Sequence, residues 1–222
     1  MDHEAERNYE PFEGAGYFCE RWFELIVAVI LGLATLGSAW SAYQSALWGG
    51  IQSFRLAEAG GAGRRAGEKA AYANQLRGVD IFLFQSYIRA VSEKNQWLAD
   101  FFFQRFRPEF KVAAEAWLAT RPLENPAAPS SPFIMKEYSI PIDKETQQLR
   151  EEEAIKFTEA RKANEISDNY LLLTVVFGVA LFIGGITAAF KERRVRTLML
   201  AMSVVIITAT AIFMAFLPLA KK

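Results

Sequence analysis

The residue types that most often carry enzyme chemistry are scarce in this 222-residue chain and lie far apart. Cys19 is the single cysteine and His3 the single histidine, so the chain has neither a disulfide pair nor a cysteine zinc motif. Asp80 stands in an apolar stretch beside Arg77, and we interpret it as a paired structural carboxylate. Because no acid, base, nucleophile or ligand set converges, we expect no enzyme, catalytic residue, cofactor or metal site.

Two charged motifs resemble ligand sites only superficially. The run Gly60–Arg65 is rich in glycine and basic, but it fits no phosphate-loop spacing and follows no predicted strand. We interpret it as a flexible joint between helices. The consecutive carboxylates of Glu151–Glu153 would point around a helix rather than converge, which indicates a solvated face.

Gln44, flanked by Ser41 and Ser45, is the most polar point within any uncharged apolar segment of the chain. Two interpretations stay open: Gln44 bonds a neighbouring helix, or it lines a pore in a ring of subunits. Transporters place ionisable groups at mid-membrane, and the apolar segments hold none, so active transport is disfavoured.

Small residues recur every fourth position around Gln44. Such spacing lets helices approach closely in lipid, where packing drives association. We therefore expect either intramolecular packing of the apolar helices or self-association into a homo-oligomer through the first. The repeats comprise Gly37, Ser41, Ser45, Gly49 and Ser53 in one segment, and Ala180, Gly184 and Ala188 in another.

Three long apolar segments, residues 22–48, 170–190 and 197–218, must position these side chains. A helix of about 20 residues spans the roughly 30 Å hydrocarbon core of a bilayer. The competing interpretation of the first segment, a cleaved signal peptide, is disfavoured because residues 1–21 are acidic rather than basic. We predict an all-α integral membrane protein with three transmembrane helices.

The loop at residues 191–196 carries four cations in six positions, Lys191, Arg193, Arg194 and Arg196. Short basic loops face the cytoplasm. This places the N-terminus in the cytoplasm and residues 49–169 in the periplasm or outside the cell. A contrary signal comes from basic residues on the predicted outer side: Arg55, Arg64, Arg65, Arg161, Lys162, Lys221 and Lys222.

Residues 49–169 form a predicted helical extramembrane domain, inserted between the first and second transmembrane helices. The pattern predicts helices over 51–73, 74–106, 109–119 and 143–169, with Asp143 as N-cap of the last. The outer two should continue into the apolar segments. Five of the eight prolines fall in residues 121–141, which predicts an extended strap packed against the domain.

An unusually dense aromatic cluster lies near the middle of this domain. Either it forms the domain core, or one side of it faces another subunit, a protein partner or the membrane surface. The candidate interaction residues are Trp97, Phe101, Phe102, Phe103 and Phe106.

The segments Ala39–Gly50, Asn74–Asp80, Phe106–Phe110 and Ser167–Tyr170 resemble those of uncharacterised bacterial membrane proteins grouped as a domain of unknown function. That resemblance implies a three-span protein of the bacterial inner (plasma) membrane and transfers no activity. The 25 basic and 25 acidic residues cancel, which argues against nucleic-acid binding. We expect an oligomeric structural or interaction subunit, or alternatively a homo-oligomeric channel lined by the first apolar helix.

Overall fold

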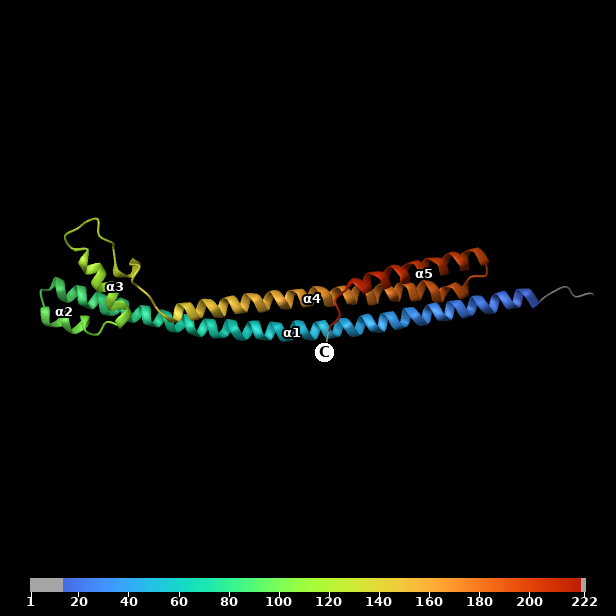
Figure 1. Cartoon of the computed structure of the whole chain (residues 1–222), viewed down its shortest axis with the longest axis horizontal. Helices are drawn as coiled ribbons and strands as arrows, with labels where there is room; N and C mark the ends of the chain where they lie inside the picture. The colour runs from blue at the N-terminus through green and yellow to red at the C-terminus, as the bar shows by residue number, and fades with distance from the viewer. Residues whose placement is uncertain (1–13, 221–222) are drawn as a thin grey trace, which may run out of the picture. The chain divides into compact units, whose positions relative to one another are not determined.

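The computed structural model describes residues 14–220, and most of the expected acidic segment 1–21 lies outside them. Every regular element in this described part is helical, so the all-α prediction is confirmed there (Figure 1). The elements are α1 (Gly14–Ser92), α2 (Gln96–Phe103), α3 (Pro108–Ala119), η1 (Pro132–Ile134), α4 (Ile142–Ile186), η2 (Thr187–Ala189) and α5 (Arg193–Phe216).

The chain divides into two compact units. Unit 1 comprises Met1–Phe54 and Glu159–Lys222, and unit 2 comprises Arg55–Thr158. The predicted domain limits, 49 and 169, fall within about a dozen residues of these divisions. α1 and α4 each contribute to both units.

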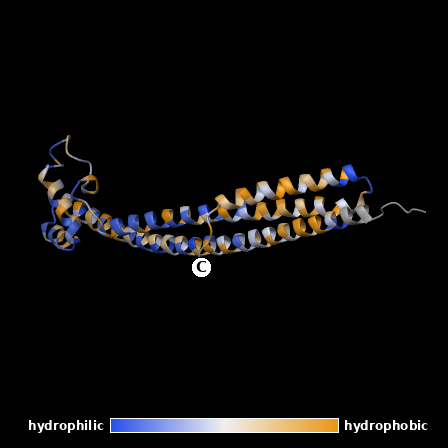
Figure 2. Cartoon of the chain, turned by 45° about the vertical axis from the view of Figure 1, so that its right-hand side comes forward, coloured by the Kyte–Doolittle hydropathy of each residue, from blue (hydrophilic) through white to orange (hydrophobic). Residues whose placement is uncertain are grey.

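Within the described residues, three helices are long and apolar enough to cross a membrane. They are α1 from Arg21 onward, α4 and α5. All three apolar stretches belong to unit 1, where Figure 2 shows the hydrophobic colour concentrated. Large apolar side chains such as Leu36 and Phe182 are 68 % exposed, whereas Thr187 and Ser203 are fully buried. An apolar exterior around small and hydroxyl side chains is the arrangement that hydrocarbon solvent favours.

The ends of the apolar helices differ from the predicted limits. α4 ends at Ile186 and is followed by the short η2, so the second apolar segment is not α-helical to residue 190. α5 begins at Arg193, so the last four residues of the expected loop 191–196 are its first turn.

α1 runs without a break through Gly49–Gly50 and through Gly60–Arg65. Continuation of the first apolar helix is thus confirmed, but the predicted flexible joint at Gly60–Arg65 is wrong. A glycine inside a helix costs about 1 kcal/mol relative to alanine without ending it. At Gly63 a Cβ would lie 2.5 Å from Glu153 Oε1, so the missing side chain leaves room for the Glu153 carboxylate.

The single helix predicted over 74–106 is also wrong. α1 ends at Ser92, Lys94 takes a positive φ of 57°, and Asn95 caps α2 by accepting a hydrogen bond from the Leu98 amide at 3.1 Å. An asparagine favours an N-cap because its short side chain satisfies an otherwise unpaired amide. The predicted cap Asp143 lies instead within the first turn of α4, which begins at Ile142.

The proline-rich strap, residues 121–141, contains turns and η1 but no α-helix, as predicted. The Trp117 indole N–H donates to the Pro129 carbonyl at 2.7 Å. Phe133 stacks on Phe110 with ring centroids 5.1 Å apart, next to the buried Phe106. The strap is therefore packed onto the core of unit 2.

Candidate functional site

The predicted polar residues of α1 are bonded within unit 1. Ser41 is fully buried and its hydroxyl lies 3.5 Å from the Met214 sulfur of α5. The Ser167 hydroxyl of α4 lies 3.2 Å from the Ser45 hydroxyl and donates to the Ser45 carbonyl at 2.9 Å. These bonds cross-link the three apolar helices.

Gln44 binds the segment that follows α5. It is 2 % exposed, and its side-chain oxygen accepts the Ala220 amide hydrogen at 3.0 Å. The Pro218 carbonyl accepts from the Trp48 indole at 3.1 Å and from the buried Tyr170 hydroxyl at 3.3 Å. Three side chains of α1 and α4 thus hold the backbone of Pro218–Ala220, which we name the tail segment.

The predicted small residues permit close contacts in the same unit. A Cβ on Gly37 would lie 2.7 Å from the Phe177 ring, and one on Gly184 would lie 2.8 Å from Leu31. A Cβ on Gly49 would meet only the Ser167 hydroxyl at an ordinary 3.7 Å. The side chain of Ala188 lies outside the described part of the structure, as do His3 and the side chain of Cys19.

The structure divides the aromatic cluster of unit 2 into two sets. Phe106 is 4 % exposed and belongs to the core, with Phe103 packed against it at a centroid distance of 5.2 Å. Trp97 is 74 % exposed and stacks on the half-buried Phe101 at 5.8 Å. Phe102 is half-buried and meets Phe101 edge-on at 5.6 Å.

Arg105 completes the exposed set. Its guanidinium carbon lies 3.4 Å from the Phe101 ring centroid, and one of its nitrogens donates to the Phe101 carbonyl at 2.9 Å. Such cation–π contact holds the arginine over the ring. We call Trp97, Phe101 and Arg105, spaced four residues apart, the aromatic stripe.

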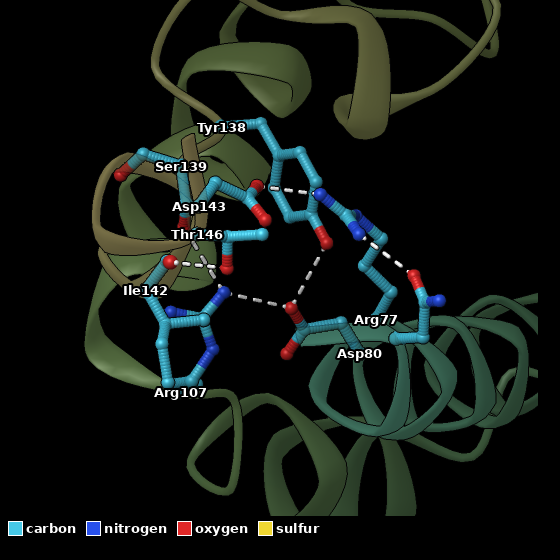
Figure 3. Close-up of polar contacts among 9 residues, drawn as sticks. Arg77, Asp80, Arg107, Tyr138, Ser139, Ile142, Asp143 and Thr146 are labelled. Atoms are coloured by element: carbon cyan, nitrogen blue, oxygen red, sulfur yellow. Dashed lines mark hydrogen bonds and ion pairs between the residues drawn. The ribbon is translucent and has the colours of Figure 1, made fainter. Parts of the chain in front are cut away.

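A second polar cluster in unit 2 is centred on Asp80 (Figure 3), whose side chain is 1 % exposed. Its Oδ2 accepts from the Arg107 guanidinium at 2.9 Å and from the Tyr138 hydroxyl at 3.2 Å. Arg107 also donates to Glu109 at 2.8 Å and to the Ser139 carbonyl at 3.1 Å. Asp80 is therefore paired, as predicted, but with Arg107, whereas Arg77 donates to Asp143 and to Asn74.

This burial shifts the acid–base behaviour of two of these groups. Burial and the adjacent Asp80 charge raise the pKa of Tyr138 to about 12. Burial lowers the pKa of Arg107, but the hydrogen bonds and charges of Asp80 and Glu109 outweigh it and leave the pKa raised. Both groups keep their protons at neutral pH, so the cluster acts as a fixed donor set that fastens the strap to α1.

The sequence did not identify Arg107 or Tyr138 as partners of Asp80. Tyr138 lies 58 residues from Asp80, and Arg107 lies 27 residues away. A buried carboxylate needs a partner, so the lone Asp80 was a signal that a basic residue must reach it from another element. The pattern did not indicate which one.

Residues within the described ranges form no group of three or more histidine, cysteine, aspartate or glutamate side chains suited to a metal. Comparison of the whole chain with protein-family models, curated proteins and solved structures gives no match. Over residues 14–220 the chain is all-helical, and three of its helices are long and apolar enough to cross a membrane.

Proposed function

We propose that this protein is a membrane-anchored interaction subunit that presents its helical unit 2 to a protein partner. The aromatic stripe is the observation that carries the proposal. Trp97 remains 74 % exposed although Phe103 and Phe106, a few residues away, pack into the core. Aromatic side chains, above all tryptophan, and arginine side chains contribute most of the binding energy at protein interfaces.

The geometry of the stripe supports a docking role. Trp97 and Phe101 stack with an interplanar angle of 27°, and the Arg105 guanidinium lies over the Phe101 ring. Mutual contact limits the rotamers of these side chains before a partner arrives. Less conformational entropy is then lost on binding.

The contacts of Ser41 and Gln44 favour this proposal over a channel lined by α1. Both side chains bond to α5 or to the tail segment of their own chain. A pore lining would require them to leave those bonds and face water. The proposal includes no enzymatic activity, cofactor or nucleic acid.

We further propose that the protein resides in a bacterial inner membrane and self-associates there. The apolar exterior of unit 1 supports the membrane location. The basic run ending at Arg196 supports a cytoplasmic N-terminus, with unit 2 in the periplasm or outside the cell. Gly32 and Gly50 of α1, where a Cβ would meet nothing within 4 Å, leave small surface outside the contacts of this chain and support self-association.

Site-specific photocrosslinking in cells tests the partner. A photoreactive amino acid replaces Trp97 in one variant and Leu123, which is 76 % exposed in the strap, in a matched control. We expect a discrete crosslinked product from position 97 that disappears when Phe101 is also changed to alanine. Equal products from both positions, or none from position 97, would contradict the proposal.

A further inference from the structure

A shallow groove runs between α1 and α4 within unit 2. It has a volume of about 570 Å³ and is lined by Leu56, Ala59, Gly60, Arg150, Glu153, Ala154 and Phe157. The seam beneath it consists of small residues, including the buried Ala59 and Ala62. Alanine side chains bury little apolar area. The larger apolar residues of the two helices lie outside this seam.

The rims of the groove are large, exposed and apolar. Leu56 on α1 is 48 % exposed and Phe157 on α4 is 52 % exposed. A leucine and a phenylalanine exposed together on the two sides of a groove indicate a surface that another helix covers.

Two glycines of α1 support the same conclusion. A Cβ on Gly60 would meet only the end of the Arg64 side chain at 3.6 Å, and one on Gly61 would meet the same guanidinium at 3.9 Å. Neither glycine is therefore required by packing within the chain. Each still costs about 1 kcal/mol of helix stability relative to alanine, which a close contact with a helix from outside would explain.

The charges of the groove indicate which helix that is. Arg150 and Glu153 are one helical turn apart on α4, and over residues 14–220 neither forms an ion pair. In a two-fold dimer the same patch meets itself, so a residue of each sign can face the opposite sign on the other copy. Hydrocarbon is a poor occupant, because it would bury both charges without partners.

We propose that a second copy of this chain docks in this groove, with the helices crossing at Gly60 and with Arg150 of each copy paired to Glu153 of the other. This inference rests on the proposed self-association and names its interface in unit 2. The four helices so formed bury Leu56 and Phe157 in a shared core.

The test compares two glycine variants of the full chain in lipid nanodiscs and in detergent. Gly60→Leu fills the groove, and Gly67→Leu makes the same substitution on α1 where a Cβ would meet nothing within 4 Å. Both changes raise helix propensity, so misfolding does not separate them. We expect Gly60→Leu to raise the dimer dissociation constant at least tenfold, and Gly67→Leu to leave it unchanged.

A charge exchange provides the second arm. Arg150→Glu and Glu153→Lys should each weaken the dimer, and the double variant should recover most of the affinity because the pair is restored with reversed signs. A wild-type protein that is monomeric at all concentrations would overturn the proposed self-association. If the wild type forms dimers and Gly60→Leu and Gly67→Leu affect them equally, self-association stands but the groove is not its interface.

Two further outcomes identify other occupants. If Gly60→Leu lowers the amount of co-purified phospholipid without changing the mass of the assembly, lipid fills the groove. If the mass changes only in the presence of a different polypeptide, that protein fills it. Either result contradicts docking of a second copy.

Discussion

At the scale of single residues, the strongest structural constraint in unit 2 is the ion pair of Asp80 and Arg107, whose side chains are 1 % and 17 % exposed. Removing one partner of a buried pair leaves a charge without compensation, which commonly costs 3–5 kcal/mol. The pair connects α1 to the segment that begins α3, and Tyr138 extends it to the strap. The strap should loosen first when Asp80 is lost.

We predict that Asp80→Ala destabilises the strap by about 3 kcal/mol, since Arg107 keeps its bonds to Glu109 and Ser139 but loses its buried carboxylate. Hydrogen exchange of peptides covering 121–141 in the full chain should become more than tenfold faster. The control is Asp143→Ala, which removes an ion pair to Arg77 whose side chains are 40 % and 44 % exposed. Exposed pairs contribute about 1 kcal/mol or less, and equal effects of the two changes would contradict the role of burial.

Tyr138 gives a pH-dependent prediction at the same site. Its pKa is raised to about 12 by burial and by Asp80, whereas an unfolded tyrosine ionises near 10. The folded state therefore keeps a proton that the unfolded state loses, and stability falls as pH rises from about 10 to about 12. Tyr138→Phe should flatten the loss of thermal stability in that window. The difference in tyrosinate absorbance between wild type and variant should show a midpoint near 12; a midpoint near 10 would contradict the burial argument.

At the scale of helices, unit 1 depends on close packing around glycines. A Cβ at position 37 would lie 2.7 Å from the Phe177 ring, but one at position 32 would meet nothing within 4 Å. We predict that Gly37→Ala lowers the thermal midpoint of the detergent-solubilised chain by several degrees, because α1 and α4 must separate. Gly32→Ala should leave it unchanged or raise it. Equal midpoints for the two variants would show that Gly37 makes no close contact.

The tail segment is a second prediction at this scale. Changing Gln44 to leucine and Trp48 to phenylalanine removes two of its three bonds to α1 and α4. A spin label at Leu219, in a chain whose Cys19 is replaced by serine, should then become markedly more mobile on the nanosecond timescale. Retained order in the double variant would mean that Tyr170 and apolar contacts suffice to hold the tail.

The sequence predicts those features of the fold that a long run of residues encodes, and misses those that depend on one or two residues. The apolar stretches extend over 20 or more residues, so the three long helices were predictable, as was the continuation of α1 and α4 into unit 2. The break between α1 and α2 lies at Lys94 and at Asn95, the N-cap of α2, and the apolar periodicity obscured it. The bond from Gln44 joins residues 176 positions apart. Such a partner is determined by tertiary packing, and no local pattern contains it.

At the scale of the whole molecule, the proposed orientation in a membrane depends on the distribution of basic residues. Short basic loops stay in the cytoplasm, and the run Lys191–Arg196, which ends in the first turn of α5, carries four cations. Lys221 and Lys222 at the end of the chain oppose this signal. We expect the loop, rather than the end of the chain, to determine the orientation, because the cations of the loop are dense and adjoin two apolar helices.

We predict that a reporter active only in the cytoplasm is active when inserted in the loop and inactive when fused after Lys222. Three membrane crossings reverse the side of the C-terminus relative to the N-terminus. Replacing Arg193, Arg194 and Arg196 with glutamine removes the orienting charge, and a substantial fraction of the molecules should then show the opposite pattern. A matched control replaces Arg64 and Arg65, which lie on the part of α1 that belongs to unit 2, and should leave the pattern unchanged. Strong cytoplasmic activity of the C-terminal fusion in the unaltered chain would reverse the assignment and place unit 2 in the cytoplasm.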